Sequence, residues 1–283
     1  MELYKYQGAG NDFLIADNRS GKITSHDGKI IDADGNVYLI SDLCDRRYGI
    51  GADGLMLLEN AQDADFKMVY FNSDGSGGMM CGNGGRCIVA FAADLGLESF
   101  DFFAADGFHT AEVLASSGKC KTVRLKMKDV AECRYYPILG DVDVPSEGYF
   151  LDTGTRHYVR FVDNLSDMDI VSEGRAIRYG AREFLPVGVN VNFVEPVNGV
   201  VKVRTYEKGV EDETFACGTG IVASCVASYV RGISPSSVNW DRVKYDVRAV
   251  RDSLSVDFLP DPSSLVKDVW LTGPATYVAK VLI

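Results

Sequence analysis

Apolar and polar residues alternate in several short segments, a pattern typical of half-buried β-strands. The alternation is clearest in Thr122–Lys128, where apolar side chains alternate with Arg and Lys, and it recurs in Val201–Tyr206 and Ser253–Phe258. Phe66–Asn72 and Ala275–Leu282 also have the composition of strands. The pattern therefore predicts β-structure in both halves of the chain.

Two apolar segments follow a helical period instead. From Ile88 to Leu95, apolar residues recur at i, i+3, i+4 and i+7, and Gly96 supplies a stop signal. A second apolar stripe runs from Ile221 to Tyr229. The first helix is apolar around most of its circumference, which indicates a helix buried inside a sheet.

Each predicted helix follows the same short motif, Cys-Gly-x-Gly. The motif occurs at Cys81–Gly84 and again at Cys217–Gly220, nearly half the chain apart. Each half shows strands, a turn, this motif, an apolar helix and further strands. This order predicts an internal duplication into two α+β domains, whose cysteines face each other across a cleft.

Other glycine-rich stretches are predicted to be turns and loops. Residues 21–36 have the composition of a loop. Asn11 falls in a glycine turn, where its amide can face a ligand or complete an Asx-type bond, and the sequence alone favours the second. Gly49–Gly54 matches the spacing G-x-G-x-x-G, but it does not follow a buried strand. We interpret it as a turn between a helix end and a strand.

Charge and composition limit the classes of partner. The net charge is −11 with no basic cluster, so nucleic acids and anionic membranes are not expected partners. The N-terminus lacks a signal-peptide layout, and no apolar run is long enough to span a bilayer. Seven cysteines, an odd number, favour reduced thiols and a cytoplasmic location.

The cysteines have three possible roles. Most cysteines of this chain are expected to be small buried apolar side chains: Cys44, Cys87, Cys120, Cys133 and Cys225. A metal site is not expected, because the spacing of Cys81 and Cys87 does not match a zinc motif and no second cysteine pairs with Cys217. A disulfide between Cys81 and Cys217 on oxidation stays open as an alternative.

The third role is acid–base catalysis by a pair of thiols. A cysteine at a helix N-terminus experiences the positive end of the helix dipole, which lowers a thiol pKa below its ordinary ~8.5. The flanking glycines let backbone N–H groups approach and bind a carboxylate. One thiolate would remove a proton beside that carboxylate and the opposed thiol would return another, which inverts a stereocentre.

The chain resembles the diaminopimelate epimerase family, whose members are amino-acid epimerases that work without pyridoxal phosphate. The resemblance covers essentially the full length. The motifs that carry it are Gly10–Phe13, Gly49–Gly54, Phe71–Ser76, Cys81–Cys87, Gly188–Phe193, Tyr206–Gly209 and Glu213–Gly220.

The resemblance implies a fold of two pseudo-symmetric α+β domains, each a mostly antiparallel mixed sheet curled around a central helix. The N-terminal domain would comprise residues 1–126 and 272–283, and the C-terminal domain residues 127–271. The active site would lie in the cleft between them. The family also implies a homodimer with a small amino-acid substrate and no cofactor.

The resemblance further implies site residues. Cys81 and Cys217 would be the catalytic base and acid. Gly82, Asn83, Gly218 and Thr219 would hold the α-carboxylate. Contacts to the distal end of the substrate would come from Asn11, Asn72, Asn190, Glu207 and Lys208, with Glu207 pairing an ammonium. Thr155 and His157 are further candidates near the site.

Three features depart from the family pattern. Thr155 replaces a substrate-binding asparagine, and Lys208 replaces an arginine that would clamp the distal carboxylate with two hydrogen bonds. The segment between Glu207 and Cys217 is slightly longer than in some members. Arg156 could compensate at the distal end, although we expect a solvated surface charge there.

The implied activity is interconversion of LL- and meso-diaminopimelate in lysine and peptidoglycan precursor synthesis. The alternative is a cofactor-independent racemase of the proline or hydroxyproline type, which shares the fold and the thiol pair. Glu207 argues against it, because proline has no distal ammonium. A non-catalytic binding protein would not need both thiols.

Overall fold

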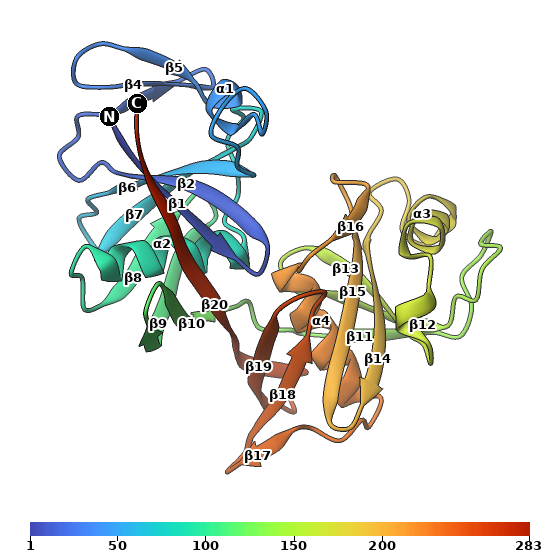
Figure 1. Ribbon diagram of the computed structural model, residues 1–283. Coiled ribbons are helices and arrows are strands. Elements are labelled where there is room, and N and C mark those ends of the chain that lie inside the picture. Colours follow the sequence, from blue (N-terminus) through green and yellow to red (C-terminus); the bar gives the residue numbers. More distant parts are fainter. The chain divides into compact units, whose positions relative to one another are not determined.

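The computed structural model describes all 283 residues. The chain divides into two compact units, which are described separately. Unit 1 comprises Met1–Leu125 and Gly273–Ile283, and unit 2 comprises Lys126–Thr272. The long strand β20 (Val266–Leu282) supplies residues to both units (Figure 1). None of the helices is long and apolar enough to cross a membrane.

Unit 1 contains two helices and ten strands in addition to the end of β20. Its elements are β1 (Glu2–Gly8), β2 (Asn11–Asp17), β3 (Thr24–His26), β4 (Lys29–Ile31), β5 (Val37–Leu39), α1 (Ile40–Cys44), β6 (Gly54–Glu59), β7 (Phe66–Asn72), α2 (Gly82–Asp94), β8 (Phe100–Ala104), β9 (Gly107–Ser117) and β10 (Cys120–Lys126).

Unit 2 contains two α-helices and nine strands besides the start of β20. Its elements are β11 (Cys133–Tyr136), β12 (Gly148–Asp152), β13 (Arg156–Phe161), the 3-10 turn η1 (Leu165–Asp167), α3 (Ile170–Gly180), β14 (Asn190–Val197), β15 (Val200–Glu207), β16 (Asp212–Thr214), α4 (Gly218–Val230), β17 (Ser237–Asn239), β18 (Arg242–Arg248) and β19 (Ser253–Pro260).

The two units repeat one order of strand pairing, which confirms the predicted internal repeat. In unit 1, β1 pairs with β2 antiparallel, β2 with β6 parallel and β6 with β7 antiparallel. After α2, β7 pairs with β8 parallel and β8 with β9 antiparallel. The same order of orientations recurs in unit 2, where β12 pairs with β13 antiparallel, β13 with β14 parallel and β14 with β15 antiparallel. After α4, β15 pairs with β18 parallel and β18 with β19 antiparallel. The sheets are therefore mixed and mostly antiparallel, as predicted.

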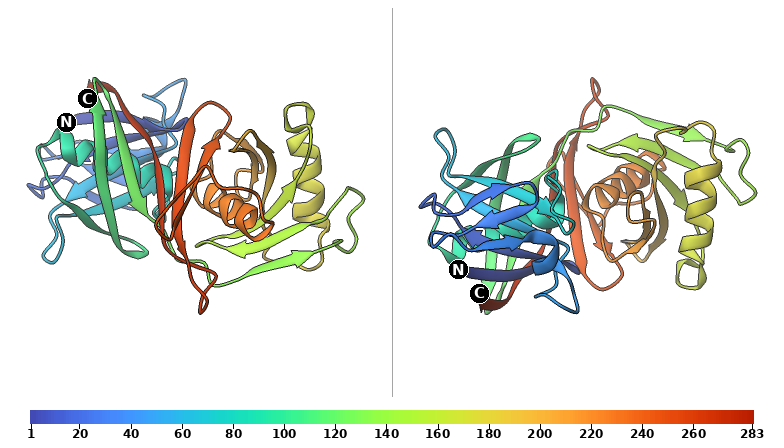
Figure 2. Two further views of the ribbon diagram at one scale, coloured as in Figure 1. Left: turned by 90° about the horizontal axis from the view of Figure 1, so that it is seen from below. Right: turned by 90° about the horizontal axis from the view of Figure 1, so that it is seen from above.

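The predicted apolar helices form the centre of each unit. All residues of α2 from Gly82 to Ala92 are buried, and α2 contacts β1, β2, β6 and β9. Figure 2 shows α4 inside the curved sheet of unit 2, with α3 on the outer side. Because a helix enclosed on all sides has no solvated face, it must be apolar around its circumference, as the sequence pattern indicated.

Two expectations about secondary structure and cysteine burial are wrong. Residues 21–36, expected to be a loop, contain β3 and β4, which pair across a tight turn and join β5 in a separate three-stranded sheet. Short strands with polar exposed faces carry little apolar alternation, so the pattern did not reveal them. Cys120 and Cys133 were expected in the core but are only partly buried.

The other three cysteines of that group behave as predicted. Cys44, Cys87 and Cys225 are buried. Burial raises the pKa of Cys44 to about 11, and it also raises the pKa values of Cys87 and Cys225. Their thiols therefore stay protonated at neutral pH and serve as apolar packing groups.

Close packing at Gly174 gives a stability prediction. A Cβ at this position in α3 would lie 2.4 Å from Cβ of Tyr206. Gly174→Ala gains up to ~1 kcal/mol of helix propensity, but overpacking costs about 1–3 kcal/mol. We therefore expect a lower free energy of unfolding in urea. Ser172→Ala, at an exposed position of the same helix, is the control and should not lose stability. Equal or higher stability of Gly174→Ala would contradict the packing.

Candidate active site

Cys81 is the residue that caps the N-terminus of α2. Its backbone is extended, and its Sγ accepts a hydrogen bond from the N–H of Gly84 at 3.3 Å. A Cβ on Gly84 would lie 3.3 Å from this same sulfur and 3.5 Å from Phe13. The glycine therefore allows the backbone N–H of the first turn to reach the cysteine side chain.

Arg86 determines how the neighbouring asparagine is turned. This arginine is fully buried, and its guanidinium donates to the carbonyl of Gly82 at 3.0 Å and to Oδ1 of Asn83 at 2.8 Å. Since Oδ1 of Asn83 accepts from Arg86, its Nδ2 is the atom that can donate to a ligand. A third bond to the carbonyl of Pro274 ties the arginine to β20.

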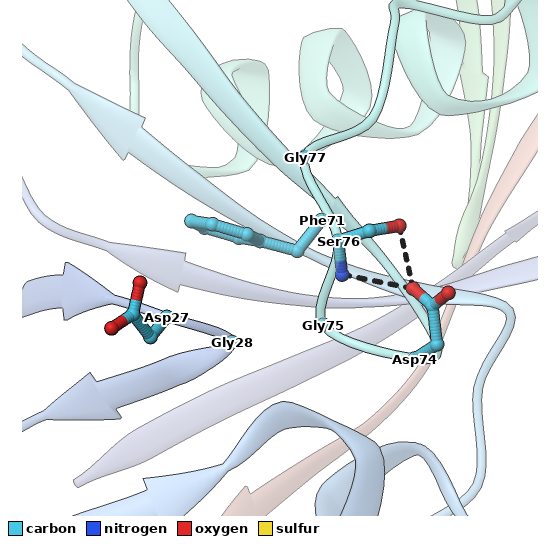
Figure 3. A pocket seen from close by; sticks show the side chains of 7 residues that line it. All are labelled: Asp27, Gly28, Phe71, Asp74, Gly75, Ser76 and Gly77. Atoms are coloured by element: carbon cyan, nitrogen blue, oxygen red, sulfur yellow. Dashed lines mark hydrogen bonds between the residues drawn. The ribbon is translucent and has the colours of Figure 1, made fainter.

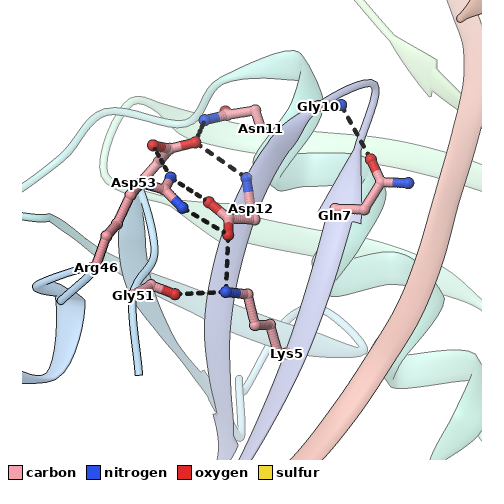
Figure 4. A network of polar contacts seen from close by, with 8 residues as sticks. All are labelled: Lys5, Gln7, Gly10, Asn11, Asp12, Arg46, Gly51 and Asp53. Atoms are coloured by element: carbon pink, nitrogen blue, oxygen red, sulfur yellow. Dashed lines mark hydrogen bonds and ion pairs between the residues drawn. The ribbon is translucent and has the colours of Figure 1, made fainter. Parts of the chain in front are cut away.

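Asn11 lies at the start of β2 in a network of charged side chains (Figure 4). Its Nδ2 donates to Oδ2 of Asp53 at 2.5 Å, and Arg46 pairs with both Asp53 and Asp12. Lys5 adds a further ion pair to Asp12. The amide of Asn11 is thus held by a carboxylate and does not make the isolated Asx-type bond expected from the turn.

Strand register explains why Asn11 and Asn72 lie at one edge of the sheet. Phe13 on β2 lies opposite Gly54 on β6, and Gly54 lies opposite Asn72 on β7. Nδ2 of Asn72 donates to Oγ of Ser76 at 3.0 Å. The predicted turn Gly49–Gly54 connects the end of α1 to β6, as expected, and places Asp53 beside Asn11.

A shallow pocket of about 460 Å³ lies next to this edge (Figure 3). It is formed where the β3–β4 turn, at Asp27 and Gly28, meets the turn after β7. Ser76 in that turn bonds to Asp74 through both its backbone N–H and its hydroxyl. None of the predicted site residues lines this pocket, but its lining residue Ser76 accepts the hydrogen bond from the predicted site residue Asn72.

Cys217 occupies the corresponding position at the N-terminus of α4. Its backbone is extended, only 8% of its surface is exposed, and its Sγ lies 3.5 Å from Oγ1 of Thr219. A Cβ on Gly220 would lie 2.3 Å from Oδ1 of Asn192. The second glycine of the motif is therefore required because the first turn of α4 packs directly on a buried asparagine.

Thr155 and His157 both contact the residue that neighbours this thiol. Nε2 of His157 lies 2.9 Å from the hydroxyls of both Thr155 and Thr219, which are 3.1 Å apart. The imidazole is completely buried, and this burial lowers the pKa of His157 to about 3. His157 is therefore neutral at physiological pH.

Asn190, Glu207 and Lys208 gather at one edge of unit 2. Asn190 starts β14 opposite His157 on β13, and its amide donates to the carbonyl of Arg156 while accepting the N–H of Lys208. Glu207 ends β15 and accepts from the hydroxyl of Thr214 at 2.9 Å. Lys208 itself is exposed.

Arg156 differs from the expected solvated charge. Its guanidinium donates to the carbonyl of Phe184 at 3.2 Å and lies over the ring of Phe150. Its role in the structure is therefore packing within unit 2.

The structure thus brings the candidate residues into two groups. In unit 1, Cys81, Gly82 and Asn83 form the N-terminus of α2, and Asn11 and Asn72 share one sheet edge. In unit 2, Cys217, Gly218 and Thr219 form the N-terminus of α4 next to Thr155 and His157, while Asn190, Glu207 and Lys208 share an edge. That Cys81 and Cys217 face each other across a cleft stays a prediction from the sequence.

Three supporting residues were missed by the sequence reasoning. Asp53 lies in a glycine motif that was interpreted as a turn and as part of the family resemblance, with no role for this aspartate. Arg86 is a lone charge in an apolar helix, and Asn192 follows Asn190 at a spacing of two. The charge of Arg86 among apolar neighbours was the available signal, because a buried charge needs partners.

Comparison with known proteins decides the family. The family model described as diaminopimelate epimerase matches residues 3–126 and 149–244. The chain belongs to the diaminopimelate epimerase family. A diaminopimelate epimerase of Flavobacterium psychrophilum is 42% identical over the whole of both chains. One of Aquifex aeolicus is 39% identical over 96% of this chain and 94% of its own.

Solved structures support the fold assignment. A phenazine biosynthesis protein of the PhzF family from Bacillus anthracis has a TM-score of 0.71 at 15% identity, covering 100% of this chain and 99% of its own. A probable proline racemase from Agrobacterium radiobacter has a TM-score of 0.69 at 17% identity, covering 100% and 92%. At such identities the likeness shows the diaminopimelate epimerase-like fold alone.

Glu207, a candidate site residue in this epimerase family member, and the nearby Glu211 should respond oppositely to pH. Burial raises the pKa of Glu207 despite the bond from Thr214. Burial also opposes ionisation of Glu211, but hydrogen bonds, including those from Gly209 and Tyr206, lower its pKa overall. A raised pKa means that stability falls as pH rises through the folded-state value, whereas a lowered pKa means that stability is lost on acidification.

We therefore expect Glu207→Gln to raise the melting temperature at neutral pH, with the difference shrinking near pH ~4. Glu211→Gln is the matched control and should lower the melting temperature at neutral pH. Scanning calorimetry of both variants across this pH range measures the effect. A lower melting temperature for Glu207→Gln at neutral pH would contradict the assignment.

Proposed function

We propose that this protein is a diaminopimelate epimerase, an isomerase that interconverts LL- and meso-2,6-diaminopimelate. The observation that carries the proposal is the repeated placement of a cysteine at the N-terminus of a buried helix, at Cys81 and Cys217. Full-length similarity to proteins named diaminopimelate epimerase supports the substrate. The reaction would serve lysine and peptidoglycan precursor synthesis.

In the proposed reaction, the substrate binds in the cleft between the two units with one α-carbon between the thiols. One cysteine, as thiolate, removes the α-proton and leaves its electron pair on the carbon. The other cysteine, as thiol, gives its proton to the opposite face. The C–H bond broken on one side is replaced on the other, so the centre is inverted and the two thiols exchange protonation states.

The carbanion is the costly intermediate, and the helix N-termini are suited to stabilise it. Backbone N–H groups at Gly82 and Gly218, with the side chains of Asn83 and Thr219, would bind the α-carboxylate as its charge grows. Because Arg86 occupies Oδ1 of Asn83, the amide presents its Nδ2 donor to that carboxylate. This orientation favours an anion over a cation at the same place.

The distal end of the substrate carries a second ammonium and carboxylate. Glu207 is the acceptor for the ammonium, and Lys208 supplies a positive charge for the carboxylate. Asn11, Asn72 and Asn190 complete the polar contacts. Thr155 is excluded from this distal group in our proposal, since its hydroxyl is engaged with His157 and Thr219.

The proline-type alternative is less well supported. The solved proline racemase and hydroxyproline epimerase structures are 17% and 18% identical to this chain, whereas relatives at about twice that identity are named diaminopimelate epimerase. We further propose that the enzyme works in the cytoplasm as a homodimer and without pyridoxal phosphate. The partly buried carboxylate of Glu207 supports a substrate with a distal cation.

The test of the function is epimerisation by cysteine variants. Wild-type enzyme, purified under reducing conditions, should convert meso- to LL-diaminopimelate, with the isomers separated by chiral chromatography. Cys81→Ala and Cys217→Ala should each lower kcat by about 10²–10⁴-fold, since each removes one proton-transfer group. Cys120→Ala, at a partly exposed thiol outside the site, is the control.

The control variant should retain wild-type turnover. If wild-type enzyme does not interconvert the isomers, the proposed substrate is wrong. If the isomers interconvert but either site variant keeps near-normal turnover, the two-thiol mechanism is wrong while the substrate stands.

A further inference from the structure

A buried polar cluster in unit 2 ends at the sulfur of Cys217. It consists of Asn192, His157, Thr155 and Thr219, linked by contacts of 2.9–3.1 Å. Asn192 and His157 are completely buried, while Thr155 is exposed. The last contact, from Thr219 to Cys217, spans 3.5 Å between oxygen and sulfur.

The orientation of Asn192 fixes the tautomer of His157. Nδ2 of Asn192 donates to the carbonyl of Tyr158 at 3.2 Å, and its Oδ1 accepts from the hydroxyl of Thr205 at 2.9 Å. The carbonyl can only accept, so the NH₂ end of the amide must face Nδ1 of His157 at 3.0 Å. Nδ1 is therefore an acceptor, and the single ring proton of neutral His157 is on Nε2.

The tautomer of His157 in turn limits the directions in which the hydroxyls of Thr155 and Thr219 can donate. Since Nε2–H of His157 can only donate, neither Thr155 nor Thr219 can place its proton on the ring. The proton of Thr155 then has one acceptor within the cluster, Oγ1 of Thr219. When Thr155 donates to Thr219, Cys217 Sγ is the acceptor that remains within the cluster for the proton of Thr219.

We propose that Thr155 is a positioning residue for Cys217: with His157 it turns the Thr219 hydroxyl toward the sulfur and so favours the thiolate form of Cys217 in the free enzyme. The proposal rests on the proposed function, because it gives Cys217 the role of the resting base. A hydrogen bond donated to the ionised form of a group favours that form. Thr155 therefore acts on the chemistry through Thr219 and does not contact the distal end of the substrate.

Other charged groups could also influence Cys217. The elements packed around α4 carry Asp152 at the end of β12 and Glu207 at the end of β15, besides His157 on β13. Both are acidic, so neither favours a thiolate. His157 has its pKa lowered to about 3 and is neutral, so it contributes a hydrogen bond and no charge. The test must therefore change the hydroxyl while leaving these groups unchanged.

Two variants at one position isolate the hydroxyl. Thr155→Val keeps the shape of the side chain and removes the hydroxyl, whereas Thr155→Ser keeps the hydroxyl and removes a methyl group. Full-length wild type and both variants are treated with iodoacetamide from about pH 6 to about pH 10, and the labelling rate of each cysteine is followed by peptide mass spectrometry. Cys81 in the same sample is the internal reference.

We expect the pH midpoint for labelling of Cys217 to rise by about one unit in Thr155→Val, and labelling below that midpoint to slow about tenfold. Thr155→Ser should keep the wild-type midpoint, and Cys81 should label alike in all three proteins. An unchanged midpoint in Thr155→Val would overturn the proposal, and so would equal shifts in both variants. Labelling needs no substrate, so the result is independent of whether the enzyme epimerises diaminopimelate.

Discussion

The N-terminus of a helix buried inside a sheet is the constraint on which the site depends. The first backbone N–H groups of such a helix have no partner within the helix and little access to water. In α2, the sulfur of Cys81 accepts one of them, and in α4 the cysteine has the same position. In our proposal, the remaining donors bind the carboxylate of the substrate. A buried helix with a cysteine at its N-terminus would then supply both the thiol and the anion site.

This arrangement also explains the glycines. Gly220 lies against Asn192 so closely that a single Cβ would overlap it, and Asn192 in turn fixes the tautomer of His157. The glycine is therefore a packing requirement as well as a route for ligand approach. In unit 1, Arg86 has a comparable role: hydrogen bonds to carbonyl and amide oxygens stabilise its buried charge, and these bonds orient Asn83.

Much of the fold could be predicted from the sequence, because buried helices and strands have apolar residues at regular spacings. The central helices were recognisable from apolar residues at i, i+3 and i+4, and the repeated motif indicated the duplication that the strand pairing confirms. The small sheet of β3, β4 and β5 has no such periodic pattern in its sequence. Its strands are three residues long, and most of their side chains are exposed.

Site residues that lie in a sequence motif could be predicted, whereas residues that reach the site only through tertiary contacts could not. Cys81 and Cys217 stood out because glycines follow both. The partners that orient the site did not, since Asp53 reaches Asn11 only through the register of β2 and β6, and Thr155 reaches Thr219 only because β13 packs on α4. Contacts of this kind depend on tertiary structure.

The central claim is that two thiols act on opposite faces of one carbon. It is tested most directly by running the reaction from LL-diaminopimelate in heavy water and analysing the first meso product by mass spectrometry and proton NMR. The account predicts one solvent deuterium at the inverted α-carbon of nearly every product molecule, because the second thiol has exchanged with solvent before it donates. Product that keeps the original α-hydrogen at the inverted centre would contradict it, since only a single group carrying the same proton from face to face could give that result.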